Sequence, residues 1–170
     1  MKNRNLRSVD MRKFILLLLV CCISNLGFTQ DLTKIDLSDL SNNQFIQTNN
    51  LEDFSRLATS AEVGVAYIDQ GQVRSYNKEN GIQLIRVKHN SLQFLNSNLN
   101  FANTVKMIVI NLASPDFDIQ TINCSNFEQF QNLKYIYFVF QINGNEINNP
   151  SSLNCISDNI MQYYSNKRPI

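Results

Sequence analysis

The longest apolar run after the N-terminus, residues 134–142, predicts the central β-strand of the fold, because aromatic and β-branched residues favour a pleated, packed surface. Alternation along a strand divides its side chains between two faces: Tyr135, Tyr137 and Val139 on one, and Ile136, Phe138 and Phe140 on the other. Both faces are apolar, so both must be covered by other layers. The run therefore predicts a strand in the middle of a sheet, packed above and below.

Helical and strand-like patterns alternate along the rest of the chain. Apolar steps of three and four predict helices over 50–58, 91–102, 127–133 and 150–165. Shorter apolar runs predict strands over 63–68, 82–88 and 105–110, with 73–76 as the second arm of a hairpin and 117–122 as an edge strand or extended connection. This order predicts a small single α/β domain over 51–170, with a mostly parallel sheet and helices packed on it. A flexible segment over 31–50 is expected to lead into it.

Two stretches of the chain are similar in sequence and suggest a second possible fold. Residues 101–110 and 130–139 share a Phe, an Asn two places later and then an apolar strand. Residues 132–138 resemble one unit of a leucine-rich repeat, in which a helix or turn leads into a short strand. This resemblance covers residues 101–140 and implies an irregular leucine-rich-repeat-like solenoid as the alternative fold.

The chain departs from that family in three respects. The strand centres Ile85, Ile108 and Tyr137 lie 23 and then 29 residues apart, and the asparagine expected after the strand is missing. A leucine-rich repeat also leaves one strand face open, whereas the central run is apolar on both. In a solenoid, the following residues would line a protein-binding face: Arg86, Lys106, Tyr135 and Tyr137. In a packed α/β domain the two tyrosines are core residues instead.

The first 30 residues have the layout of a secretory signal peptide. Basic residues precede an uncharged apolar run over 14–23, and a small or polar stretch follows, with cleavage expected within 27–30. The run is shorter than the roughly 20 residues that a membrane-spanning helix needs. The leader resembles those of exported proteins of Bacteroidetes-type bacteria. It predicts a periplasmic, cell-surface or extracellular protein with no stable membrane insertion after cleavage; the alternative is a membrane anchor formed by an uncleaved leader.

Charge and cysteine content change once this leader is removed. Five of the 15 basic residues but one of the 14 acidic residues lie in it, so the remainder carries 10 basic and 13 acidic residues, a net charge of −3. The basic residues are scattered, which argues against nucleic acid as a partner. Two cysteines remain, Cys124 and Cys155, and an even pair in an oxidising compartment predicts a disulfide; the alternative is two buried thiols.

Motifs for catalysis, metals and cofactors are lacking in the sequence. His89 is the only histidine, and it follows a predicted strand, where α/β enzymes often place functional groups. A nucleophile–His–acid set would need Ser91, Ser114 or Cys124 with Asp116 or Asp118, and no spacing brings these together, so His89 and Asp116 stay weak catalytic candidates. One histidine and two distant cysteines give no zinc spacing, and the five glycines form no phosphate-binding loop.

These observations predict a small exported protein without a catalytic centre, a cofactor or a metal. A binding or interaction module whose partner is another protein is the function they favour. The alternative is a small secreted hydrolase whose site is assembled only in three dimensions.

Overall fold

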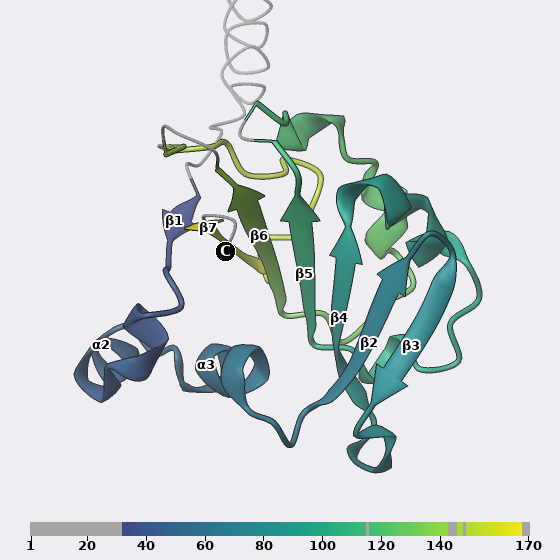
Figure 1. Ribbon diagram of the computed structural model, residues 1–170, viewed down its shortest axis with the longest axis horizontal. Helices are drawn as coiled ribbons and strands as arrows, with labels where there is room; N and C mark the ends of the chain where they lie inside the picture. Colours follow the sequence, from purple (N-terminus) through teal and green to yellow (C-terminus); the bar gives the residue numbers. More distant parts are fainter. Residues whose placement is uncertain (1–31, 115, 143–145, 148, 168–170) are drawn as a thin grey trace, which may run out of the picture.

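A single sheet of seven strands organises the residues that the computed structural model describes, which are 32–114, 116–142, 146–147 and 149–167 (Figure 1). The strands are β1 (Thr33–Lys34), β2 (Gly64–Asp69), β3 (Gln72–Tyr76), β4 (Ile82–Lys88), β5 (Met107–Leu112), β6 (Tyr135–Gln141) and β7 (Met161–Lys167). Their order across the sheet is β1-β7-β6-β5-β4-β2-β3, and all neighbours are parallel except the β2–β3 hairpin. The predicted mostly parallel α/β sheet is confirmed. The predicted leader, residues 1–30, and the turn predicted near 143–145 lie outside the described residues.

Short helices lie on both sides of this sheet. One side carries η1 (Asp39–Ser41), α2 (Asn43–Thr48) and α3 (Glu52–Thr59). The opposite side carries η3 (His89–Asn96), η4 (Ala102–Thr104), η5 (Ile119–Thr121) and η6 (Cys124–Phe127), while η2 (Lys78–Asn80) joins β3 to β4. The predicted helix over 50–58 is therefore confirmed as α3, with two acids in its first turn, where the helix dipole favours negative charge.

The strand β6 is the buried centre that the sequence predicts, since all its residues except the last are buried. Its two faces belong to two separate apolar clusters. Ile136, Phe138 and Phe140 pack against η3 to η6, whereas Tyr135, Tyr137 and Val139 pack against α3 and the segment before it. The prediction that both faces of this strand are covered is confirmed.

The prediction of a helix over 150–165 is wrong, because the structure places the strand β7 (Met161–Lys167) at the C-terminal end of that range. β7 pairs in parallel with β6 along its whole length, from Tyr135 opposite Met161 to Gln141 opposite Lys167. The apparent helical spacing mixed apolar residues of a connecting loop with residues of a strand. Pairing to a fully buried neighbour outweighs that weak local pattern.

Three other predicted elements are shorter or differ in type. The helix predicted over 91–102 is present as the 3-10 helices η3 and η4, and the one predicted over 127–133 is replaced by η6 and turns. The strand or extended connection predicted over 117–122 contains η5. There the side chain of Asp118 accepts a hydrogen bond from the backbone N–H of Gln120 at 2.9 Å, which is typical of a helix start.

Residues 32–50, for which the sequence predicts a flexible segment, form β1, η1 and α2. The side-chain oxygen of Asn42 caps α2 by accepting bonds from the backbone N–H groups of Gln44 (3.0 Å) and Phe45 (3.2 Å). Ile35 is buried, and its carbonyl oxygen accepts a 2.8 Å hydrogen bond from the hydroxyl of Tyr137. This segment therefore adds the edge strand β1 beside β7 and packs against Tyr137 of β6.

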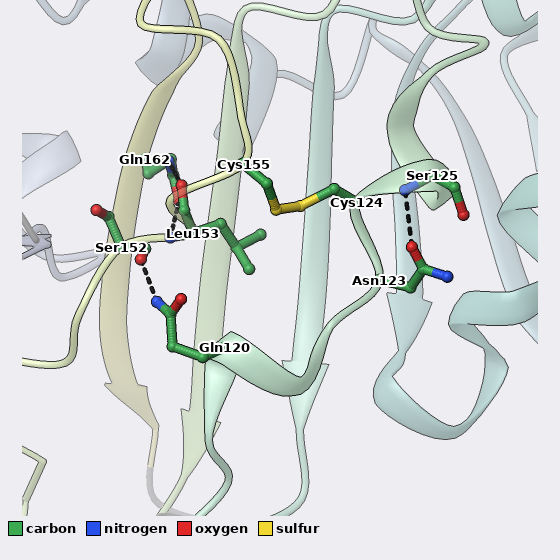
Figure 2. Close-up of a disulfide and its surroundings, with 8 residues drawn as sticks. All are labelled: Gln120, Asn123, Cys124, Ser125, Ser152, Leu153, Cys155 and Gln162. Atoms are coloured by element: carbon green, nitrogen blue, oxygen red, sulfur yellow. Dashed lines mark hydrogen bonds between the residues drawn. A yellow bond between two sulfur atoms is a disulfide. The ribbon is translucent and has the colours of Figure 1, made fainter. Parts of the chain in front are cut away.

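The two cysteines predicted to form a disulfide lie close together on the loops on either side of β6 (Figure 2). Cys124 in η6 and Cys155 before β7 lie at disulfide distance, with their Cα atoms 6.1 Å apart. Gln162 of β7 reinforces this junction, since its side chain accepts from the N–H of Leu153 at 2.9 Å and donates to the carbonyl of the same residue at 3.1 Å. The pair therefore fastens the connection before β7 to the connection before β6.

Candidate functional site

The sheet face beneath α3 is covered over only part of its width. Phe54 of α3 is fully buried and makes edge-to-face contacts with Tyr135, Tyr137 and Tyr163, at centroid distances of 5.5, 5.3 and 4.9 Å. These three tyrosines belong to β6 and β7, so this part of the helix lies over those strands, while Leu57 nearer its end shares a cluster with Leu84 of β4. In Figure 1, the β2–β3 hairpin stands at the opposite edge, away from α3.

Electrostatic contacts hold α3 in this position. Asp53 accepts hydrogen bonds from Arg56 at 2.9 Å and from Lys134, the residue before β6, at 3.1 Å. Partial burial acts to raise the pKa of Asp53, but these two hydrogen bonds outweigh it and hold the pKa below its usual value. The bridge to Lys134 ties the start of the helix to the central strand, and Arg86 of β4 contacts the carbonyl oxygen of Ala58 at the other end, so β2 and β3 lack such cover.

The uncovered half of this face forms a groove of about 800 Å³. Its floor is made by β2, β3 and β4, and its wall by the end of α3 and the residues after it, 57–61. The side chains that give it chemical character come from the three strands: Val65, Tyr67, Arg74, Tyr76, Arg86 and Lys88. We refer to these six residues as the open face.

Strand register places these side chains in rows across the sheet. Tyr67 of β2 lies between Arg74 of β3 and Arg86 of β4. The same row continues through Val109 and Tyr137, where it passes beneath α3. One lateral row is therefore apolar and buried at one end, and charged, aromatic and open at the other.

A tight hairpin turn fixes the register of the two outer strands. Gln70 and Gly71 both have positive φ, 48° and 79°, as a two-residue type I′ turn requires. Any side chain larger than hydrogen at Gly71 would also approach the ring of Phe94. The turn sets Tyr67 opposite Arg74 and Val65 opposite Tyr76, so it assembles the open face.

Two tyrosines give the open face an exposed aromatic surface. Tyr67 and Tyr76 are 43% and 56% exposed, and their rings meet edge to face at a centroid distance of 5.6 Å and an angle of 88°. Large exposed aromatic side chains are typical of interaction surfaces, where they supply contact area at little entropic cost. Among the described residues, Tyr67 and Tyr76 are two of the five large hydrophobic side chains that are exposed.

The basic residues of the open face differ in their partners. Lys88 forms a 2.7 Å ion pair with Asp69. Arg86 donates to the carbonyl oxygen of Ala58, at the end of α3, at 3.1 Å, a favourable place for a cation near a helix C-terminus. Arg74 makes a long contact of 3.5 Å to the side-chain oxygen of Gln72. Neither arginine has a carboxylate partner among the described residues.

The residues predicted to share a binding face in a solenoid are separated by the structure. Arg86 belongs to the open face, but Tyr135 and Tyr137 are 5% and 2% exposed beneath α3. Burial raises the pKa of the Tyr137 hydroxyl to about 12. Lys106 is half-buried at the start of β5, where its carbonyl oxygen accepts from the backbone N–H groups that begin β6. Arg86 alone of the four belongs to the open face.

The two catalytic candidates lie elsewhere, beyond the C-terminal ends of the strands. The ring of His89 makes an edge-to-face contact with Phe117 at 5.3 Å, and its buried Nδ1 atom has no hydrogen-bond partner within the described part of the chain. Asp116 is exposed and lines a small depression of about 230 Å³ with Phe117 and Pro150. No hydrogen bond or ion pair between described residues connects His89 to Asp116.

Metal-binding clusters and membrane-spanning helices are both absent from the described residues. Within those ranges, no group of three or more His, Cys, Asp or Glu side chains is arranged to hold a metal ion. No helix there has the length and apolar character needed to cross a membrane.

Comparisons with known proteins give no relative from which a function could be transferred. No protein-family model matches the chain, and neither a curated protein nor a solved structure matches it. The open face must therefore be interpreted from its own chemistry.

Sequence reasoning missed most of this face. Tyr67, Arg74 and Tyr76 lie on strands that were predicted correctly, and alternation places them on one side of the hairpin. The available signal was that β3 alternates polar and apolar residues and places Arg74 and Tyr76 on one face. What alternation could not reveal is that α3 stops short of them.

Proposed function

We propose that this chain is a small exported binding module that recognises a partner protein through the open face. The observation that supports it is the exposed Tyr67–Tyr76 pair beside two arginines that lack carboxylate partners among the described residues. Tyrosine and arginine are the residues most enriched at energetically important positions of protein interfaces. The sheet and α3 serve as a rigid support for these side chains.

Charge indicates what kind of partner surface fits. The groove is lined by Arg74, Arg86, Lys88 and Asp69, so it is locally positive, although the chain after its leader carries a net charge of −3. A partner with an acidic patch would be attracted to this part of the molecule in particular. Export is supported by the leader-like N-terminus and by the cysteine pair, because disulfides persist in oxidising compartments.

A leucine-rich-repeat-like solenoid remains our alternative to the packed α/β domain as a description of the fold. It is supported by the way β4, β5, β6 and β7 follow one another as parallel neighbours, with short 3-10 helices in the connections before β5 and β6. The cover that α3 provides over Tyr135 and Tyr137 argues against an open concave surface along the whole sheet. In either description the accessible part of this face is the part over β2 to β4.

Site-directed photo-crosslinking in the native host tests the proposed function. A photoreactive phenylalanine analogue at position 67 is expected to capture one protein with a fixed stoichiometry. The matched control places the same analogue at Gln93, an exposed position on the opposite side of the sheet, where no adduct is expected. Reversing the charge with Arg74→Glu should abolish the adduct at position 67. Equal labelling from both positions, or no protein adduct at position 67, would refute the proposal.

A further inference from the structure

We infer that the ligand of the open face is an extended acidic segment of the partner protein, which crosses the strands and places carboxylates on Arg74 and Arg86. The inference rests on the proposed function and specifies the chemistry of its ligand. It follows from three properties of the face: which cations are available, how far apart they are, and what lies between them.

The available cations are the two arginines. Lys88 is already neutralised by Asp69 at 2.7 Å, whereas Arg74 and Arg86 contact only an amide oxygen and a backbone carbonyl among the described residues. A guanidinium has five N–H donors, so both arginines retain donors for a ligand. Carboxylate is the group that pairs best with this planar fork, through two parallel hydrogen bonds.

The spacing of the two arginines suits an extended chain. Both occupy the same row, with Tyr67 between them, so their Cα atoms are separated by two strand spacings, roughly 10 Å. A peptide in the extended polyproline II conformation rises about 3.1 Å per residue with three residues per turn, so side chains three residues apart point the same way and span about the same distance. Acidic residues at positions i and i+3 would therefore meet the two guanidinium groups.

The residues between those acids would lie over aromatic surface. Tyr67 is flanked by the two arginines and contacts Tyr76 in the next row. An apolar or aromatic side chain between the acids can pack on this pair while the charges are satisfied at either end. Arg86 is held in place for this by its bond to the carbonyl of Ala58, which reduces the ordering cost of binding.

A nucleic acid would fit this face less well. A single strand carries a charge at each nucleotide, and its proteins usually present a continuous basic groove. Here two cations are available, on a chain that is otherwise net negative after its leader. A polyanion would therefore be repelled by the rest of the surface.

Amide NMR titration of the exported chain with synthetic peptides tests the inference. The probe is a twelve-residue peptide of serine and threonine with Glu-Leu-Tyr-Glu at its centre, and the matched control replaces both glutamates by glutamine. The glutamate peptide should shift the amides of β2, β3 and β4 and bind roughly tenfold more tightly than the glutamine peptide. Raising the salt concentration should weaken the binding.

Two variants and one control locate the effect. Arg74→Gln and Arg86→Gln should each weaken binding of the glutamate peptide roughly tenfold. Lys78→Gln, which removes a positive charge from η2 outside the groove, should leave the affinity unchanged. The amide spectrum of each variant shows directly whether it is folded, and Arg74→Gln keeps the test valid if loss of the contact between Arg86 and Ala58 disturbs α3.

The outcomes separate this inference from the proposed function. Equal affinity for the glutamate and glutamine peptides, or an equal loss of affinity in the Lys78→Gln control, would overturn the acidic-segment inference. So would a single-stranded oligonucleotide that shifts the same amides more strongly than the peptide. A protein adduct at position 67 in the crosslinking experiment would still support the proposed function in either case, whereas its absence would remove both.

Discussion

Replacing Phe54 by alanine should remove most of the packing that holds α3 on the sheet. The side chain is fully buried, and its ring contacts Tyr135, Tyr137 and Tyr163 at centroid distances of 4.9 to 5.5 Å. Truncating a buried Phe to Ala typically costs 3–5 kcal/mol, through reduced burial and the cavity that remains. Because the truncation removes three edge-to-face ring interactions at once, we expect the upper part of that range, about 4–5 kcal/mol.

Urea unfolding followed by circular dichroism measures this cost. With a slope of about 2 kcal/mol per molar urea, the midpoint of Phe54→Ala should fall by roughly 2 M. Phe45→Ala is the matched control, because Phe45 lies on the neighbouring helix α2 and is only half-buried, so its truncation should cost clearly less. Both chains should keep the Cys124–Cys155 pair oxidised during the measurement.

A cost below about 1 kcal/mol for Phe54→Ala would refute the reasoning, since that value is typical of a surface substitution. It would mean that α3 does not cover β6 and β7. The division of the sheet face into a covered half and an open face would then fail as well, because it depends on where this helix lies.

The remaining predictions concern a buried hydroxyl, a glycine and the cysteine pair. Burial raises the pKa of the Tyr137 hydroxyl to about 12 from 10.0, so the stability that the protonated hydroxyl contributes is complete below pH 10 and is lost as the pH rises through 12. Over that window the free energy of unfolding of the wild-type chain should fall by roughly 3 kcal/mol relative to Tyr137→Phe, as measured by urea unfolding at each pH. Gly64→Ala should destabilise the protein by more than about 1 kcal/mol in thermal unfolding, because a Cβ there would overlap the backbone carbonyl of Gly81; an unchanged melting temperature would contradict that close approach. A bridge between Cys124 and Cys155 predicts that the intact mass of the exported chain rises by two hydrogens on reduction, and that reduction lowers the free energy of unfolding by about 3–4 kcal/mol. Two free thiols before reductant is added would count against the bridge.

The parts of the fold that were predictable are those where one local pattern decides the outcome. The central run over β6 is apolar, aromatic and β-branched from Tyr135 to Phe140, which favours a strand covered on both faces. The hairpin turn at Gln70 and Gly71 and the amphipathic α3 likewise carry their own signals.

Elements that depend on distant partners could not be predicted in this way. The strand β7 is polar or half-buried at most positions and is specified mainly by its pairing with β6, which lies some twenty residues earlier in the chain. The open face has a similar origin. Tyr67, Arg74 and Arg86 come from three strands, and they become one surface only through register and through the limited length of α3.

Rates of tyrosine modification test the central claim most directly, because all six tyrosines of the sequence lie on strands of this sheet. In tyrosine nitration followed by peptide mass spectrometry, Tyr67 and Tyr76 should react first, and the buried Tyr135 and Tyr137 should be protected. Adding the glutamate peptide should slow the reaction at Tyr67 and Tyr76 alone. Modification of Tyr137 as fast as Tyr67, or unchanged rates at Tyr67 with the peptide bound, would contradict the account.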